Sequence, residues 1–337
     1  MYQLLLIVLL AASASGCGQS SYPPYSLKVV NGIDARPYSW PWQVSLQVGN
    51  GYRFSHTCGG TLISSNWVMT AGHCISSGRD YRVVLGEYDR NVDEGGEQII
   101  SPSGIFVHPK WNMNCVACGN DIALIRLSEH AVLNDKVQVA CIPPFGYILP
   151  NNFYCYITGW GRLYTNGPLP GKLQQAYIPV IDYDHCSAKD WWGSIVKKTM
   201  VCAGGGEKSG CNGDSGGPLN CKGSDGLWYV HGVTSFVSAI GCNTIRKPTV
   251  WTRVSAFNYW IAEVNGVSKQ KGILISVLHS YTSFESPDSR FCSVLHIQGS
   301  DSYWSFALGS VTTASPTPLK PRFSNGCFCQ TLDLCKI

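Results

Sequence analysis

The residues with the clearest chemical potential are a serine, a histidine and an aspartate from distant parts of the chain. Ser215 lies in the stretch Cys-Asn-Gly-Asp-Ser-Gly-Gly-Pro, where glycines permit a turn that exposes the hydroxyl. Serine is a weak nucleophile unless a base and a carboxylate assist it. His73, in Thr-Ala-Gly-His-Cys, and Asp121, in Gly-Asn-Asp-Ile-Ala-Leu, can supply both. Each motif alone is more often a turn, a structural histidine or a cap, but together they predict nucleophilic catalysis by serine.

The order of the three residues along the chain points to one class of enzyme. His73, Asp121 and Ser215 follow the order of chymotrypsin-like enzymes, which differs from that of subtilisins and α/β-hydrolases. Over about residues 29–266 the chain resembles the trypsin/chymotrypsin family, and within it the pancreatic elastases of the proteinase E type. The segments that carry this closer resemblance lie at 38–43, 115–121, 159–167 and 197–202.

The resemblance implies a role for each residue of the site. Ser215 would attack the peptide carbonyl, His73 would take and return the proton, and Asp121 would orient the histidine. Backbone N–H groups of Gly213 and Ser215 would form the oxyanion hole. The reaction would be peptide hydrolysis through an acyl-enzyme, and no cofactor is expected for catalysis.

Composition favours a secreted protein. The chain has 337 residues, of which 45% are hydrophobic, and a net charge of only +4 without a basic run, so nucleic acid is not an expected partner. Sixteen cysteines at scattered spacings indicate disulfides formed in an oxidising compartment. Residues 1–16 read as a signal peptide, and no later segment reaches the roughly 20 apolar residues of a spanning helix, so no membrane is expected.

The next segment, 17–28, reads as an activation peptide. It is polar and contains two prolines, and it ends at Lys28, before Val29-Val30-Asn31-Gly32. The resemblance implies that trypsin cuts after Lys28 and that the new ammonium of Val29 then pairs with Asp214. Removing one partner of a buried ion pair costs about 3–5 kcal/mol, so this pair is a suitable switch. The alternative is an ordinary lysine in a loop.

The remaining chain predicts an all-β fold. Residues 43–48 alternate polar and apolar side chains, as a half-buried strand does, and further short β-rich runs follow. The resemblance implies two antiparallel β-barrels, expected within a protease domain at 29–266. Ser255 can cap a terminal helix that stops at Asn265-Gly266. Residues 267–337 resemble no family. They are expected to be a poorly ordered tail, or else translation past the normal last exon junction. The further β-rich runs are 67–70, 81–85, 122–127, 154–158 and 228–234.

The residues expected around the substrate indicate a narrow pocket. By alignment on the motif, Ser209 occupies the pocket base, where trypsin-like enzymes have an aspartate. Val237 and Thr249 both replace glycines of chymotrypsin-like enzymes, and Ser235, Phe236 and Val237 form the strand that pairs with substrate. We therefore expect cleavage after Ala or other small aliphatic residues, graded because one methylene is worth only about 1–3 kcal/mol.

Twelve cysteines fit disulfide pairings implied by the resemblance. Zinc is the rival interpretation of the Cys115/Cys118 pair, but no second pair of ligands lies nearby in the sequence. The Cys17–Cys141 bridge would keep the activation peptide attached after cleavage. The expected pairs are Cys17–Cys141, Cys58–Cys74, Cys115–Cys118, Cys155–Cys221, Cys186–Cys202 and Cys211–Cys242.

One acidic stretch, residues 87–97, resembles the calcium loop of trypsins and elastases. Glu87 and Glu97 would supply carboxylates, and Asp89 and Val92 would supply main-chain oxygens, to a structural Ca²⁺. The alternative is a solvated loop.

Together these features predict a monomeric, secreted digestive serine endopeptidase made as a zymogen. Its expected partners are protein and peptide substrates, trypsin as activator, and protease inhibitors. The alternatives are an inactive protease-like binding protein, or a poorly secreted isoform with a disruptive tail. All residues expected of an active enzyme are present, which disfavours the inactive alternative.

Overall fold

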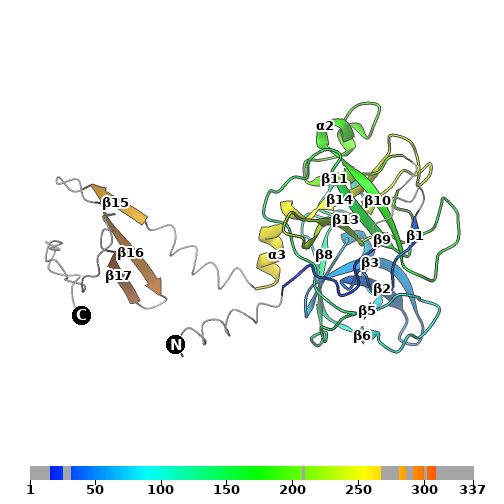
Figure 1. Cartoon of the computed structure of the whole chain (residues 1–337), viewed down its shortest axis with the longest axis horizontal. Coiled ribbons are helices and arrows are strands. Elements are labelled where there is room, and N and C mark those ends of the chain that lie inside the picture. Colours follow the sequence, from blue (N-terminus) through cyan, green and yellow to red (C-terminus); the bar gives the residue numbers. More distant parts are fainter. Residues whose placement is uncertain are drawn as a thin grey trace. The chain divides into compact units, whose positions relative to one another are not determined.

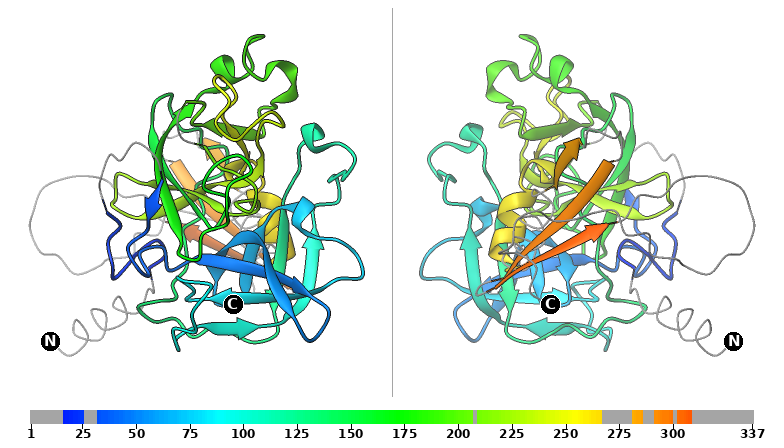
Figure 2. Two further views of the ribbon diagram at one scale, coloured as in Figure 1. Left: turned by 90° about the vertical axis from the view of Figure 1, so that its right-hand side faces the viewer. Right: turned by 90° about the vertical axis from the view of Figure 1, so that its left-hand side faces the viewer.

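A computed structural model gives the architecture of the chain (Figure 1). It describes residues 16–25, 32–206 and 209–266, together with the backbone of three strands beyond them. The chain divides into two compact units, residues 1–268 and 269–337. The first unit contains two seven-stranded antiparallel sheets, and in Figure 2 the blue and cyan strands of one lie below the green and yellow strands of the other.

The first sheet, which we call the N-terminal sheet, is curled. In the described part of the chain its edge strands β6 and β7 do not pair with each other. Its strands in spatial order are β6 (Gln98–Ile100), β5 (Asp80–Leu85), β2 (Gln43–Gly49), β3 (Phe54–Ser64), β4 (Trp67–Thr70), β8 (Ala123–Leu127) and β7 (Pro102–Val107).

The second sheet, the C-terminal sheet, closes into a barrel because β9 pairs with both β10 and β12. The predicted all-β fold is therefore confirmed, as one closed barrel and one curled sheet. The strands in spatial order are β1 (Ile33–Asp34), β10 (Gln174–Ile181), β11 (Met200–Ala203), β14 (Thr249–Arg253), β13 (Trp228–Phe236), β12 (Pro218–Lys222) and β9 (Tyr154–Gly159).

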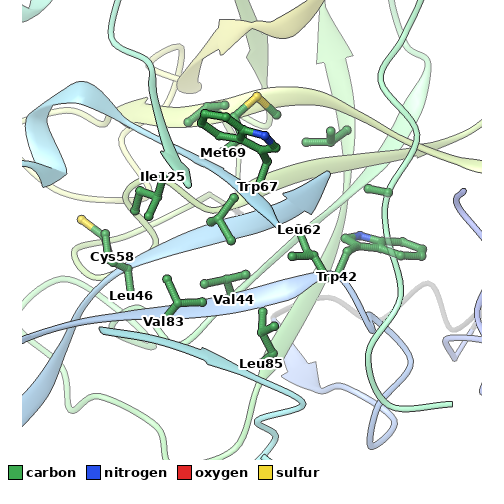
Figure 3. Packing of buried hydrophobic residues seen from close by; sticks show 14 of the residues in the cluster. Trp42, Val44, Leu46, Cys58, Leu62, Trp67, Met69, Val83, Leu85 and Ile125 are labelled. Atoms are coloured by element: carbon green, nitrogen blue, oxygen red, sulfur yellow. The ribbon is translucent and has the colours of Figure 1, made fainter. Parts of the chain in front are cut away.

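Strand β2 differs from its prediction in burial. Its apolar side chains pack against β5, with Val44 opposite Leu85 and Leu46 opposite Val83 (Figure 3). The intervening polar residues are buried as well, although alternation predicted an exposed face. They are tolerated because their side chains have hydrogen-bond partners: Gln43 Oε1 accepts from the Thr158 hydroxyl, 2.6 Å away, and Ser45 Oγ bonds His56 Nδ1.

The junction between the sheets is built around tryptophans. Trp42 is fully buried, and its Nε1–H donates to Asn220 Oδ1 at 2.8 Å in the other sheet. Trp40 Nε1–H donates to Gln175 Oε1 at 2.9 Å. These bonds tie a large apolar surface to a specific partner, so they fix how the two sheets meet.

The terminal helix α3 (Asn258–Val264) begins later than predicted, and Ser255 as its cap is wrong. Ser255 lies in the preceding turn η5 (Val254–Ala256), where its hydroxyl donates to the Tyr147 carbonyl oxygen. The predicted stop is confirmed, since Gly266 has a φ of 74°, a conformation that favours glycine.

Residues 16–25 form a segment, here called the strap, that lies along the first unit. Its Gly18 N–H donates to the Val139 carbonyl oxygen at 2.7 Å, and Gly18 O accepts from Trp228 N–H. At its end, Tyr25 O accepts from the Tyr156 hydroxyl and from Gln175 Nε2. The strap is thus held by hydrogen bonds at both ends as well as by a disulfide from Cys17.

In the second unit, the strands β15 (Tyr281–Glu285), β16 (Phe291–Gly299) and β17 (Ser302–Leu308) form an antiparallel sheet in sequence order. Among the helices of the described residues, none combines the length and the apolar character needed to cross a membrane.

Candidate active site

Two of the three predicted catalytic residues are joined directly. His73 lies in a short turn, η2 (Gly72–Cys74), just after β4, and Asp121 immediately precedes the run into β8. His73 Nδ1 is 2.7 Å from Asp121 Oδ2, and His73 N–H donates to Asp121 Oδ1 at 2.9 Å. The aspartate is 1% exposed, whereas the histidine side chain is 24% exposed. This arrangement holds Nδ1–H on the carboxylate and leaves Nε2 for a reacting group.

Two further side chains hold Asp121, and neither was predicted to do so. The Ser235 hydroxyl donates to Asp121 Oδ2 at 2.5 Å, and the Thr252 hydroxyl donates to the Asp121 carbonyl oxygen at 2.7 Å. Ser235 was predicted only as part of the substrate-pairing strand. The carboxylate therefore has several donors, which restrict its rotation and, through it, the orientation of His73.

Ser215 is positioned through the backbone on either side of it. Its carbonyl oxygen accepts from Gly59 N–H of β3 at 2.7 Å, and the next residue, Gly216, donates to Thr234 O of β13 at 2.8 Å. A Cβ on Gly216 would lie 3.1 Å from Cys74 Sγ, which places this turn beside the neighbour of His73. In the described part of the chain the Ser215 hydroxyl makes no hydrogen bond to His73. Such bonds are often long before substrate binds.

A partly buried histidine, His56, supports the predicted oxyanion loop by a hydrogen bond. Gly213 has a φ of 104°, and its carbonyl oxygen lies 3.2 Å from His56 Nε2. Because a carbonyl can only accept, Nε2 carries the proton and Nδ1 accepts from the Ser45 hydroxyl, 2.9 Å away. Burial lowers the pKa of His56 to about 4, in keeping with a neutral ring.

Asp214 is buried beside a cavity. Its carboxylate accepts from Cys211 N–H at 2.8 Å and Gly161 N–H at 2.9 Å. Burial raises its pKa to about 6, although both hydrogen bonds act to lower it. The adjoining cavity, of about 550 Å³, has Asp214, Ser209 and residues 32–34 among its lining residues. The predicted cleavage residues Lys28 and Val29 lie outside the described residues.

The predicted pocket residues Ser209 and Thr249 are in direct contact. Their hydroxyl oxygens are 2.7 Å apart, and Thr249 Oγ1 also accepts from Gly210 N–H at 2.8 Å. Thr249 is fully buried, and these two hydrogen bonds satisfy its hydroxyl group. On the expected substrate strand, Phe236 packs edge-on against Trp192, and Val237 is half-buried.

The acidic loop brings together the two carboxylates predicted to bind calcium, those of Glu87 and Glu97, and adds that of Glu94. Carboxylate oxygens of Glu87, Glu94 and Glu97 all lie within 4.8 Å of one another. Burial, then the nearby carboxylates of Glu97 and Glu94, raise the pKa of Glu87 to about 7. Glu94 was missed because its spacing in the sequence carries no signal of its own. Of the predicted main-chain ligands, Asp89 O accepts a hydrogen bond from Val92 N–H at 3.0 Å. Convergent carboxylates in a turn suit a hard cation such as Ca²⁺.

Six disulfides link twelve cysteines of the described chain. Cys58–Cys74 ties the turn of His73 to β3, and Cys211–Cys242 ties the Ser215 loop to the chain after β13. The bonded pairs are Cys17–Cys141, Cys58–Cys74, Cys115–Cys118, Cys155–Cys221, Cys186–Cys202 and Cys211–Cys242.

Comparison with known proteins identifies the class to which this site belongs. The family model described as Trypsin matches residues 29–261, and the chain is a member of the trypsin family of serine proteases. Within that family it is a close homologue of elastase-like serine endopeptidases. It is 68% identical over 265 residues to human chymotrypsin-like elastase family member 3B, covering 78% of this chain and 98% of the relative. It is 70% identical over 240 residues to bovine proproteinase E, covering 71% and 95%, and 55% identical over 253 residues to bovine chymotrypsin-C, covering 74% and 94%.

Proposed function

We propose that the protein is a secreted digestive endopeptidase, made as a zymogen, that cleaves peptide bonds after Ala and other small aliphatic residues. The observation that carries the proposal is the buried Asp121 carboxylate on His73 Nδ1, beside the loop of Ser215. Membership of the trypsin family and the six disulfides support peptide hydrolysis outside the cell.

The chemistry follows from the proton positions. His73 Nε2 takes the proton of the Ser215 hydroxyl as the oxygen attacks the substrate carbonyl, and Asp121 stabilises the resulting imidazolium. The N–H groups of Gly213 and Ser215 donate hydrogen bonds to the carbonyl oxygen as it becomes negatively charged. Loss of one such donor typically lowers the rate about 10²–10³-fold. Nε2–H then protonates the leaving amine. Water next attacks the carbonyl of the acyl-enzyme while His73 Nε2 takes its proton, and that proton returns to the Ser215 oxygen as the acid product leaves.

The side chains at the proposed pocket base support a preference for small residues before the cleaved bond. A Ser209–Thr249 hydroxyl pair offers no charge to a Lys or Arg side chain, and the Thr249 side chain occupies space that a glycine would leave open, as Val237 is proposed to do on the substrate strand. A side chain larger than a few methylenes would displace these groups.

The buried carboxylate of Asp214 is the proposed partner of the new N-terminal ammonium of Val29. Within the described residues Asp214 forms no ion pair, burial raises its pKa to about 6, and the adjoining cavity is lined by Gly32. Val29 is three residues earlier, so an extended chain of about 10 Å, at roughly 3.3–3.6 Å per residue, could carry its new ammonium to that cavity. Cleavage by trypsin after Lys28 would supply the ammonium.

We also propose a structural Ca²⁺ on the acidic loop, held by Glu87 and Glu97, with Glu94 beside them. The ion would neutralise three close carboxylates and would take no part in the reaction. Main-chain oxygens of Asp89 and Val92 remain the further proposed ligands.

The test is hydrolysis of peptides that differ only in the residue before the cleaved bond, before and after trypsin treatment of the secreted protein. We expect cleavage after Ala that depends on the cut at Lys28, and none in a Ser215→Ala variant. Activity without preference for Ala would refute the pocket argument alone. No activity after a verified cut would favour an inactive binding protein, and failure of secretion would favour a disruptive tail.

A further inference from the structure

A second cavity lies on the N-terminal sheet, and the proposed catalytic steps do not use it. Its volume is about 620 Å³, and it shares no lining residue with the cavity beside Asp214. Strands β2, β3, β5 and β6 and the acidic loop form its walls. The lining residues that matter here are Phe54, His56, Arg82, Val92 and Ile99.

Arg82 is held in this cavity in a way that suits recognition of a carboxylate. Its Nε–H donates to Gln47 Oε1 at 2.8 Å across the β2–β5 pair, and its guanidinium lies 4.7 Å from the centre of the Phe54 ring. Arg82 forms no ion pair with any residue that the structure describes. Its other N–H groups can therefore bind an anion in the paired geometry that guanidinium favours.

A chain of hydrogen bonds connects this guanidinium to the catalytic loop. Beyond Gln47, the amide Nε2–H donates to Ser45 Oγ at 3.4 Å, and Ser45 bonds His56 Nδ1. His56 Nε2–H in turn donates to the Gly213 carbonyl oxygen. The cavity is thus built against the back of the proposed oxyanion loop, because His56 both lines it and supports Gly213.

The position of Ser215 indicates which part of a substrate would reach the cavity. Ser215 lies between β3, which bonds its carbonyl oxygen through Gly59, and β13, which bonds Gly216 through Thr234. Under the proposed function the acyl half of the substrate follows the end of β13. The leaving half then crosses β3, the strand that supplies Phe54 and His56 to the cavity.

We propose that this cavity is an accessory substrate site that binds an Asp or Glu side chain on the C-terminal side of the cleaved bond, with Arg82 as its anion-binding residue. The proposal rests on the proposed function. Val92 and Ile99, each 56% exposed, offer apolar contact to residues next to the acidic one. The cavity is also lined by Arg90 and by three carboxylates, those of Glu87, Asp93 and Glu97, so the site requires the proposed calcium to offset their negative charge.

The test compares paired peptide substrates in buffer containing calcium. The pairs are identical up to an Ala before the cleaved bond and carry Glu or Gln at the second, third or fourth position after it. We expect activated protein to cleave the Glu member of at least one pair with a kcat/KM about fivefold higher, on the scale of a partly exposed charged hydrogen bond. Arg82→Gln should cleave the Glu and Gln members of the pair equally well, and Arg82→Lys should keep part of the preference for Glu.

The control variant is Arg126→Gln, which removes an exposed arginine of the same sheet that does not line the cavity. It should keep the wild-type ratio. A chromogenic Ala substrate with nothing but the dye after the cleaved bond tests the proposed function separately and shows whether Arg82→Gln is folded. If all proteins cleave that substrate but the wild type shows no Glu preference, or Arg82→Gln keeps it, the accessory site is refuted while the protease assignment stands.

Discussion

Gly216, directly after the proposed nucleophile, allows a quantitative test of how the site is packed. Its φ is 75°, and a Cβ there would lie 2.2 Å from Thr70 Oγ1 and 2.7 Å from the Gly59 carbonyl oxygen. These two atoms hydrogen-bond each other at 2.8 Å. Gly226 is the matched control, because its φ is 83° and nothing lies within 4 Å of an added Cβ. The Gly→Ala change thus meets the same backbone strain at both positions and a steric clash at only one.

The magnitudes follow from these contacts. The left-handed conformation costs an alanine about 1–2 kcal/mol at either position. At Gly216, overpacking adds about 1–3 kcal/mol, and loss of the Thr70–Gly59 bond adds about 1 kcal/mol. We therefore expect Gly216→Ala to lower the free energy of unfolding by about 3–6 kcal/mol, and Gly226→Ala by about 1–2 kcal/mol.

The assay is thermal unfolding in a Ser215→Ala background, which removes self-digestion. At roughly 2–4 °C per kcal/mol for a domain of this size, Gly216→Ala should lower Tm by about 6–24 °C and Gly226→Ala by about 2–8 °C. In the wild-type background Gly216→Ala should also reduce kcat/KM about 100-fold, because the nucleophile is displaced. Equal Tm changes for the two variants would refute the packing described for this loop.

Three other predictions concern the site. Ser235→Ala should lower kcat about tenfold with KM unchanged, because one donor to Asp121 is lost; an unchanged kcat would contradict a positioning role. Thr249→Gly should raise cleavage after Leu relative to Ala about tenfold, measured with paired peptides, and an unchanged ratio would contradict the pocket model. Without metal, the pKa of Glu87 is raised from its usual 4.5 to about 7 in the folded protein. Protonated Glu87 therefore stabilises the folded state at low pH, and this stabilisation is lost as pH rises from 4.5 through 7. Since Ca²⁺ requires the ionised carboxylate, calcium should raise Tm more at pH 8 than at pH 5, and equal shifts would argue against this site.

The sequence was sufficient for the fold and for the motifs of the site, but not for the contacts that hold them. Each predicted β-rich run coincides with an observed strand to within two residues, but other strands, among them β3, β10 and β14, carried no signal that singled them out. The hydrogen bond from Ser235 to Asp121 joins residues 114 positions apart, so no local pattern could indicate it. The Ser255 prediction failed because its hydroxyl found a partner at Tyr147, and tertiary contact outweighed local capping.

The polar residues of β2 illustrate the same limit from the opposite side. Alternation indicated that Ser45 and Gln47 face solvent, yet the chain returns over them and supplies His56 and Arg82 as partners. Period-two patterns report the chemistry of side chains, and they do not report which other strand will cover a polar face.

The strap has a consequence for how the activated protein behaves as an assembly of two chains. Under the proposed activation, a cut after Lys28 makes the strap a separate peptide that is tethered through Cys17 and hydrogen-bonded at Tyr25. A tether of this length keeps the short peptide at an effective concentration in the millimolar range near the residues that it contacts. A free peptide of the same sequence would therefore compete poorly at micromolar concentration. After reduction of the Cys17–Cys141 bridge, only the hydrogen bonds of the strap would hold the peptide. Its association would then be bimolecular, and the peptide would dissociate on dilution.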